Sequence, residues 1–404
     1  MPGATIDHLV SLVMLISVLL TSFGLCSHML DNAIAFQRYH QVAMKTVDLV
    51  DGMCLSPGIP SDWGIISGIP STFGLQNLEI GGYALSPFPI MRIMDPSNTI
   101  SLGGSTFFNF SMGPGAYFFL PVADHVNYSS VTRLLGVNTS YGFRLTISPT
   151  LRVSISEMPQ DPLQIRVAVK GPRDGPVGKA TVDATLLCAS KGQAQYPSIE
   201  LLTNTAETDE TGSALMTFPT IDPTEDNYSI FARVNLSGLN GISYYSSIIE
   251  AESLLVPVIT NYETGEVMLV HLFDITEGED PPADALFYNM TYFVRTWNFG
   301  FRPIEIEGDS WGKVELGHSG EDFLTIPTSE PGILVIAWSG VIHGEGRVDR
   351  IVMMPWGMGA FGMQDPITFG GDPSGHEWVA TELRQVTVSQ ISYQVKLAAW
   401  KLGM

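Results

Sequence analysis

Cysteine is scarce in this 404-residue chain, which has only Cys26, Cys54 and Cys188. Three cysteines cannot form the dense disulfide framework that holds small secreted folds together. Cys26 lies inside an apolar run, so Cys54 and Cys188 are the candidates for a disulfide bond. The sequence leaves open whether these two residues pair.

Positive charge is also scarce, with 20 Lys and Arg against 41 Asp and Glu, giving a net charge of −21. Proteins that bind nucleic acid need basic patches, so this balance argues against a nucleic-acid partner. Charged residues make up only 15% of the chain and hydrophobic residues 45%, which is typical of a folded protein. The acidity suits a body exposed to a salty or cation-rich medium.

Sequence patterns of enzymes are scarce too. No His-Glu-x-x-His or Cys-x-x-Cys occurs, and the glycine-rich stretch 357–375 contains no Gly-Lys-Ser/Thr and so is no P-loop. The eight histidines are scattered without metal-ligand spacing. We therefore expect no catalytic residue, no bound cofactor and no enzyme activity, although a surface hydrolase with residues gathered from several regions stays an alternative.

The chain does contain one long hydrophobic run, residues 9–30, which has no Lys, Arg, Asp or Glu. About 20 apolar residues in a helix span the roughly 30 Å hydrocarbon core of a bilayer. Apolar residues then continue at helical spacing to about residue 53, and no proline occurs between Ala4 and Ser56. We predict one continuous helix over residues 1–56, with a transmembrane first half and an amphipathic second half.

The second half of this helix needs a partner for its apolar stripe. The stripe could pack on the chain's own body or on a neighbouring copy, and the sequence leaves both open. The residues that would form such an assembly face are Ala33, Ile34, Phe36, Val42, Ala43, Val47 and Val50.

A turn-rich segment with the pattern LSPGIPSDWGIISGIPSTFGLQ follows the helix at residues 55–76. Together with Gly3 and Asp7 before the apolar run, it resembles archaeal type IV pilins and pilin-like surface membrane proteins over about the first 76 residues. The residues that carry the pattern of this turn are Pro57, Gly58, Pro60, Trp63 and Gly64. The resemblance implies assembly through the N-terminal helix, with copies of this chain or other pilin-like proteins as partners beside the lipid bilayer. Cleavage after Gly3 and an uncleaved anchor both stay open.

The rest of the chain predicts a mainly β protein, because runs rich in aromatic and β-branched residues alternate with Gly and Pro turns. We expect two or three β-sandwich or Ig-like domains. Their predicted ranges are a β-rich domain at 57–158, an Ig-like sandwich at 159–255 and a C-terminal β-rich domain at 256–404. The last stretch, 380–402, reads as one long strand or a strand pair.

The middle range carries the clearest pattern, a Gly-Pro-Val turn before one strand and a Thr-Asp-Glu-x-Gly turn before another. It resembles the Ig-like modules common in surface proteins, through a set of residues in two turns and the strands that follow them: Gly175, Pro176, Val177, Ala180, Val182, Thr208, Asp209, Glu210, Gly212 and Ala214. Such modules space and present other groups, which favours a structural or adhesive protein.

Asn-x-Ser/Thr sequons, acceptors for N-glycosylation, support an extracellular body. They occur at Asn109, Asn127, Asn138, Asn227, Asn235 and Asn289, and none lies in the first hundred residues. Arg38 and Lys45 lie on the C-terminal side of the apolar run and would favour the opposite orientation, but two basic residues are a weak bias for a long domain.

Two acidic clusters are the candidates for a Ca²⁺ site, although neither has the spacing of a known calcium loop, and solvated turns are the alternative. Their residues are Asp222, Glu225 and Asp226 in one, and Asp274, Glu277, Glu279 and Asp280 in the other. The sequence as a whole predicts a single-pass, membrane-anchored extracellular protein, a pilin-like subunit or component of a surface assembly. The alternative is a surface ligand-binding or sensor module that does not polymerise.

Overall fold

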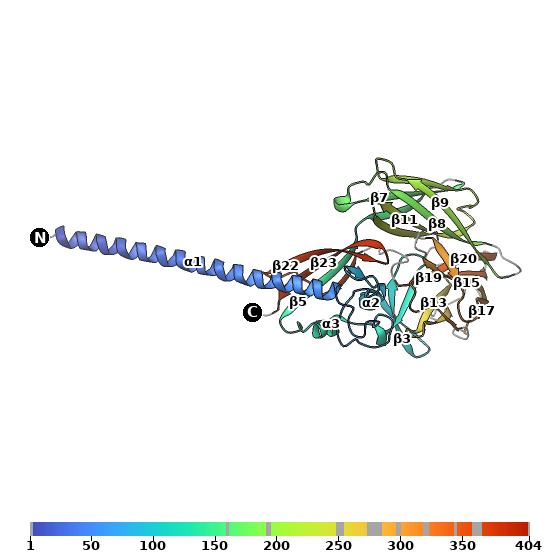
Figure 1. The fold of residues 1–404 in the computed structure, drawn as a ribbon, viewed down its shortest axis with the longest axis horizontal. Coiled ribbons are helices and arrows are strands. Elements are labelled where there is room, and N and C mark those ends of the chain that lie inside the picture. Colours follow the sequence, from blue (N-terminus) through green and yellow to red (C-terminus); the bar gives the residue numbers. More distant parts are fainter. Residues whose placement is uncertain are drawn as a thin grey trace.

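A computed structural model describes residues 3–158, 161–190, 195–247, 254–272, 285–295, 300–317, 323–342, 346–357 and 366–402. The protein is mainly β with one long helix, α1 (Gly3–Cys54), as the sequence predicts. The helix projects from the body as a rod, and the N-terminus lies at its far end (Figure 1).

Helix α1 has 52 residues and is about 78 Å long at 1.5 Å per residue. It ends shortly before Pro57, which has no backbone N–H to donate and cannot extend the helix. From His8 to Gln41 its residues are exposed, except for the half-buried Ala35. The helix is long and apolar enough to cross a membrane, as the sequence indicates.

The sheet beside α1 joins strands that are far apart in the sequence, in the order β1-β22-β23-β5-β21. Only the β1–β22 pair is parallel, and the end of α1 packs on β22 and β23. The strands are β1 (Ala84–Leu85), β5 (Tyr141–Pro149), β21 (Ile367–Gly370), β22 (Val379–Val388) and β23 (Ile391–Lys401). The predicted C-terminal strand is thus a hairpin. It turns at Ser389 and Gln390, whose positive φ angles of 46° and 70° suit a tight two-residue turn.

Two sheets form a separate sandwich, in the orders β10-β7-β6 and β12-β11-β8-β9. Side chains from both sheets share one buried cluster, and alternate residues of β7 are buried, as a strand with one covered face requires. The strands are β6 (Arg152–Met158), β7 (Leu163–Lys170), β8 (Thr181–Ser190), β9 (Ser198–Glu207), β10 (Ser213–Phe218), β11 (Asn227–Leu236) and β12 (Leu239–Ser246). The sandwich therefore begins with β6, inside the range assigned to the preceding domain.

The remaining strands form three more sheets, in the orders β2-β3-β4, β13-β14-β18 and β16-β15-β19-β20, with β17 also paired to β15. Their bounds are β2 (Asn98–Leu102), β3 (Ser105–Ser111), β4 (Tyr117–Pro121), β13 (Leu255–Asn261), β14 (Glu266–His271), β15 (Ala285–Arg295), β16 (Phe301–Ile304), β17 (Trp311–Glu315), β18 (Phe323–Thr325), β19 (Gly332–Ile342) and β20 (Gly346–Trp356). Short helices are α2 (Pro87–Ile93), α3 (Tyr128–Leu134) and the 3₁₀ turns η1 (Val122–Asp124) and η2 (Pro172–Asp174).

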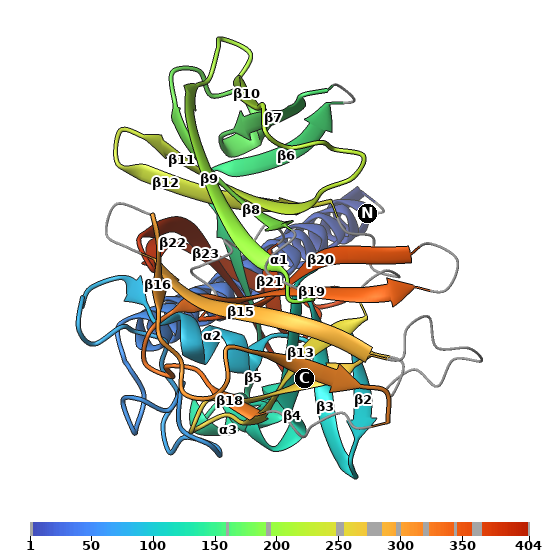
Figure 2. The same cartoon turned by 90° about the vertical axis from the view of Figure 1, so that its right-hand side faces the viewer.

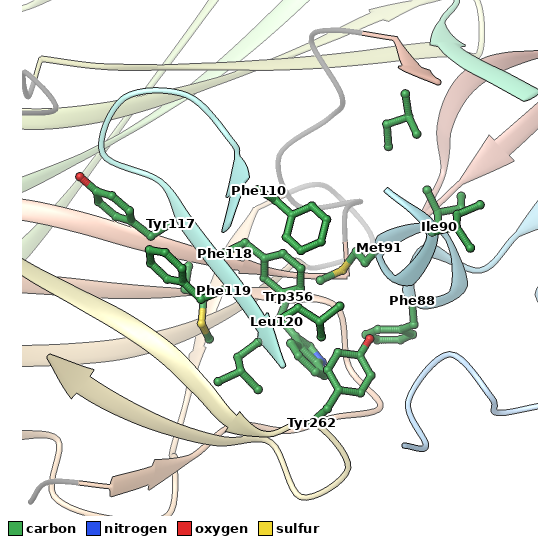
Figure 3. Packing of buried hydrophobic residues seen from close by; sticks show 14 of the residues in the cluster. Phe88, Ile90, Met91, Phe110, Tyr117, Phe118, Phe119, Leu120, Tyr262 and Trp356 are labelled. Carbon is green, nitrogen blue, oxygen red and sulfur yellow. The ribbon is translucent and has the colours of Figure 1, made fainter. Parts of the chain in front are cut away.

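The ranges 57–158 and 256–404 share a sheet and a hydrophobic core. Strand β5 pairs with β23 and β21, and one buried cluster takes side chains from both ranges. In this cluster Trp356 packs on Phe88 and Tyr262, with ring centroids 5.9 and 4.9 Å apart. Figure 3 shows these aromatic side chains gathered between α2 and β4.

The sandwich lies on the outer face of the β15–β19–β20 sheet (Figure 2). A third buried cluster fills this contact, with Leu187 and Phe231 from the sandwich and Val335, Ala337 and Ile351 from the sheet. The two parts are therefore joined by an apolar interface as well as by the chain.

Candidate functional site

The junction between α1 and the body divides the predicted assembly stripe into two parts. Val42 and Val50 are buried against the body, at 2% and 0% exposure, while Ala43 and Val47 are half-buried. The other three predicted residues, Ala33, Ile34 and Phe36, are exposed. Of the two partners that the sequence left open, the chain's own body therefore covers the last turns of the helix.

An ion pair fixes the last turns of α1 to the sheet. Arg384 on β22 donates from Nε and Nη2 to the two carboxylate oxygens of Asp51, at 2.8 and 3.2 Å, and Tyr83 donates its hydroxyl to the same carboxylate at 3.0 Å. The hydrogen bond from Arg384 holds the pKa of the Asp51 carboxyl below its usual range. A two-point contact of this kind fixes the rotation of the helix as well as its position.

Residues 57–76, which form the turn after α1, fold into a compact segment that we call the collar. Its centre is Trp63, which is 1% exposed and whose indole N–H donates to the carbonyl oxygens of Pro57 and Gly74 at 3.0 and 2.9 Å. Gly58 has a φ of +82°, and a Cβ there would lie 2.7 Å from the Trp63 indole nitrogen. A Cβ on Gly64 would lie 2.4 Å from Pro89. The residues of the pilin-like pattern therefore have a local structural role: they bring the chain back over a buried tryptophan.

A fully buried arginine on α2 holds the collar to the body. Arg92 is 0% exposed and donates to four carbonyl oxygens: Asp124 at 2.7 Å, Ile66 at 2.6 Å, Trp63 and Gly68. Burial lowers the pKa of its guanidinium, but an arginine stays charged in a protein. The carbonyl dipoles solvate this charge in place of water.

Two aromatic rings complete the Arg92 site. Its guanidinium carbon lies 5.5 Å from the Trp63 ring centroid and 5.6 Å from that of Tyr262, which is cation–π range. Tyr262 also donates its hydroxyl to the carbonyl of Gly64 at 2.8 Å. Sequence reasoning missed Arg92, although a lone arginine inside the apolar run PFPIMRIM at 87–94 is a signal that could have found it.

The contacts described at the junction hold the end of the helix in place. Its polar groups form hydrogen bonds with one another, and burial raises the pKa of the Cys54 thiol to about 12, so this sulfur is a poor nucleophile. Cys54 and Cys188 are both free and buried, so no disulfide joins them, and Cys26 is exposed on α1.

The sequons lie in different surroundings. Asn127 and Asn138 are exposed, while Asn109, Asn235 and Asn289 are half-buried. Asn227 is 4% exposed, donates to the Ser247 hydroxyl and accepts from the backbone N–H of Ile351. A glycan on this amide would not fit the folded chain.

The structure gives no support to the first acidic cluster as a cation site. Asp222 accepts hydrogen bonds from Thr224, and Asp226 accepts from the Asp222 backbone. Among the described residues no three or more His, Cys, Asp or Glu side chains are grouped to hold a metal ion. The second cluster, Asp274 to Asp280, lies outside the described residues.

The motif Gly-Asp-Ser-Trp-Gly at 308–312 matches the Gly-x-Ser-x-Gly pattern of serine hydrolases, and the sequence analysis missed it. In those enzymes the serine stands on a turn between a strand and a helix. Here the string runs into strand β17, so Ser310 is not on such a turn. A second string, Gly-x-Gly-x-x-Gly at 357–362, lies almost wholly outside the described residues.

Comparisons with known proteins assign no family. No family model matches the chain, and no curated protein matches it. Among solved structures, human GIVD cytosolic phospholipase A2 aligns at 8% identity with a TM-score of 0.10. This alignment covers 65% of the chain and 33% of the phospholipase, and a TM-score this low does not indicate a shared fold.

Proposed function

We propose that this protein is a single-pass, membrane-anchored extracellular protein that serves as a pilin-like structural or adhesive component of a cell-surface assembly. Helix α1 anchors it, and the β-rich body is presented outside the cell. The observation that carries the proposal is the division of α1, whose residues 8–41 are exposed while residues 42–54 pack on the body.

The exposed segment is longer than the bilayer requires. If residues 9–30 span the membrane, residues 31–41 extend about 16 Å beyond it. The ion pair of Asp51 and the collar around Arg92 fix the next turns to the body, so α1 holds the body away from the membrane as a rigid stalk. A stiff stalk suits a protein that presents a surface to neighbouring subunits.

The apolar residues left on the stalk favour a subunit of an assembly over an isolated receptor. Ile34, Phe36 and Tyr39 are 39%, 73% and 45% exposed. Large apolar side chains on a soluble stalk cost solvation free energy unless another surface covers them. Helices of neighbouring copies, or of other pilin-like proteins, are the partners that the resemblance implies.

The alternative is a surface binding module that does not polymerise. Electron microscopy and particle sizing of the protein extracted from its native envelope, with N-terminal sequencing of the same sample, separate the two. For a processed pilin we expect filaments whose subunits begin at Gly3 or Ala4. Discrete particles whose chains begin at Met1 or Pro2 would contradict the pilin hypothesis and favour an anchored binding module.

Protease protection tests the orientation separately. Protease added to intact cells should digest the body and leave a membrane-protected fragment of α1. Full protection of the body in intact cells, with digestion only after lysis, would place it in the cytoplasm and overturn the extracellular assignment.

A further inference from the structure

A cleft opens where the sandwich leaves the outer face of the β15–β19–β20 sheet. Ala337 and Ile351 on that face are buried beneath the sandwich. Further along, the segment before β9 bridges the two parts: Ser339 donates its hydroxyl to the carbonyl of Gln195 at 2.7 Å, and Asn289 donates its amide to the carbonyl of Pro197 at 3.1 Å. Beside these contacts lies a cavity of about 360 Å³.

Strand register places the residues around this cavity on one face. Phe287 is paired with Ser339 on β19 and with Lys313 on β17, and residues directly opposite in antiparallel strands point to the same side. Trp311 is paired with Asn289, two residues further along β15, and so belongs to the same face. We call this set of residues, with the cavity, the aromatic cleft.

The cavity has the size and composition of a small-ligand site. Its wall is largely apolar, with Ala285, Phe287 and Val341, while Gln195 and Arg347 supply amide and guanidinium groups. Ligand pockets typically measure about 300–1,000 Å³, combine apolar walls with a few polar groups, and occur often between domains.

Three aromatic rings form one side of the cleft. The Tyr196 ring stands edge-on to Phe287, with centroids 5.7 Å apart, and to Trp311, with centroids 5.0 Å apart. Trp311 is nevertheless 58% exposed, so most of its ring is free to contact a ligand. A single exposed tryptophan is ordinary on a protein surface, but one held beside two other rings and a cavity forms a preorganised flat platform.

Charged side chains at the cleft that the structure describes include two pairs of opposite sign. Arg347 pairs with Asp349 at 3.0 Å, and Lys313 pairs with Glu315. Each pair offers hydrogen-bond donors and acceptors without net charge. The chain as a whole carries a charge of −21, which repels anions. The matching ligand is uncharged, rich in hydroxyl groups, and has an apolar face that can lie on an aromatic ring.

We propose that the aromatic cleft binds a neutral saccharide, with one sugar ring stacked on Trp311 and a neighbouring ring entering the cavity beside Phe287. The Arg347–Asp349 and Lys313–Glu315 pairs would bind its hydroxyl groups. This inference rests on the proposed function in one respect: an extracellular body is exposed to glycans.

The test uses the full chain in a polyoxyethylene detergent, which has no sugar headgroup to compete. Saturation-transfer NMR and titration calorimetry would probe glucose, galactose, mannose, N-acetylglucosamine and their disaccharides. We expect at least one to bind with a Kd below about 1 mM. Trp311→Ala should weaken that binding by about tenfold or more, since aromatic anchors dominate binding sites.

The matched control is Phe323→Ala on β18, which removes another exposed aromatic ring, 49% exposed, outside the cleft. It should bind the saccharide as the wild type does. Both substitutions are at exposed positions, so unchanged thermal unfolding would show that the fold is intact. The proposal is overturned if no neutral sugar binds, if Trp311→Ala binds normally, or if only charged sugar acids bind.

Failure of this proposal is distinguishable from failure of the proposed function. A body outside the cell that binds none of these sugars would overturn the saccharide site alone. A body protected inside the cell that still binds a sugar in detergent would overturn the extracellular assignment and leave the chemistry of the cleft in place.

Discussion

The predicted assembly stripe of α1 has two parts, residues 33–36 and residues 42–50, which are both apolar but have different surroundings. Ile34 and Phe36 are exposed, while Val42 and Val50, about two to four turns further on, are buried. The difference comes from β22 and β23, which lie beside the last turns only. An apolar stripe therefore shows that a helix needs a partner, but it does not show which turns the chain itself covers. The predictions below test this division of α1 and the junction that produces it.

The largest effect is expected at Arg92, which joins the collar to the body. Arg92→Ala would leave four buried carbonyl oxygens without their donor, and we expect it to destabilise the fold by about 3–5 kcal/mol. Chemical unfolding of the body measures the loss. Arg133→Ala, at an exposed position on α3, is the control and should stay within about 0.5 kcal/mol of the wild type. Equal stability of the Arg92 variant would show that the collar does not depend on this arginine.

A pair of truncations compares the exposed and the buried part of the assembly stripe directly. Val50→Ala should destabilise the body by about 2 kcal/mol, because it leaves a cavity against the sheet. Ile34→Ala should change that stability by less than about 0.5 kcal/mol, because this side chain lies on the exposed part of α1. Ile34→Ala should instead weaken self-association in detergent, measured by analytical ultracentrifugation. If both variants lost the same stability, the buried and exposed parts of the stripe would not differ as described.

The sequence predicted the helix, its apolar span and most strands, because these depend on local patterns. The run FYNMTYFVRTW at 287–297 is rich in aromatic and β-branched residues, which favour strands, and β15 (Ala285–Arg295) lies there. The sequence did not predict that β5 pairs with β23, since these strands are about 250 residues apart and no local pattern specifies such a partner. Without knowledge of this pairing, the sequence divided 57–158 and 256–404 into two domains, although they share a sheet and a core. The Arg92 site was missed for the same reason, because the carbonyl groups that surround it come from two segments, the collar and Asp124, that are about 60 residues apart in the sequence.

Two glycines, Gly52 before the end of α1 and Gly64 after it, compare the packing of the helix with that of the collar. Gly64→Ala should destabilise by about 1–3 kcal/mol, because its Cβ would lie 2.4 Å from Pro89 within the collar. Gly52→Ala should stabilise by up to about 1 kcal/mol, because nothing lies within 4 Å of its Cβ and alanine favours the helix. Thermal unfolding of the two variants should therefore shift in opposite directions. Shifts of the same sign would contradict the packing described for the collar.

The smallest effect concerns the ion pair that sets the rotation of α1. The folded-state pKa of Asp51 is lowered by Arg384, so the pair stabilises the fold above the unfolded-state pKa of about 4 and loses this contribution as the pH falls through the folded value. Since both side chains are partly exposed, we expect only about 1 kcal/mol. Asp51→Asn should remove that contribution at neutral pH and flatten the fall in stability below about pH 4, with Asp48→Asn, on the exposed side of the same turn, as the control. An Asp51 variant that kept the acid sensitivity of the wild type would mean that other carboxylates cause it. In that case α1 would be fixed to the body by its apolar contacts and the collar alone.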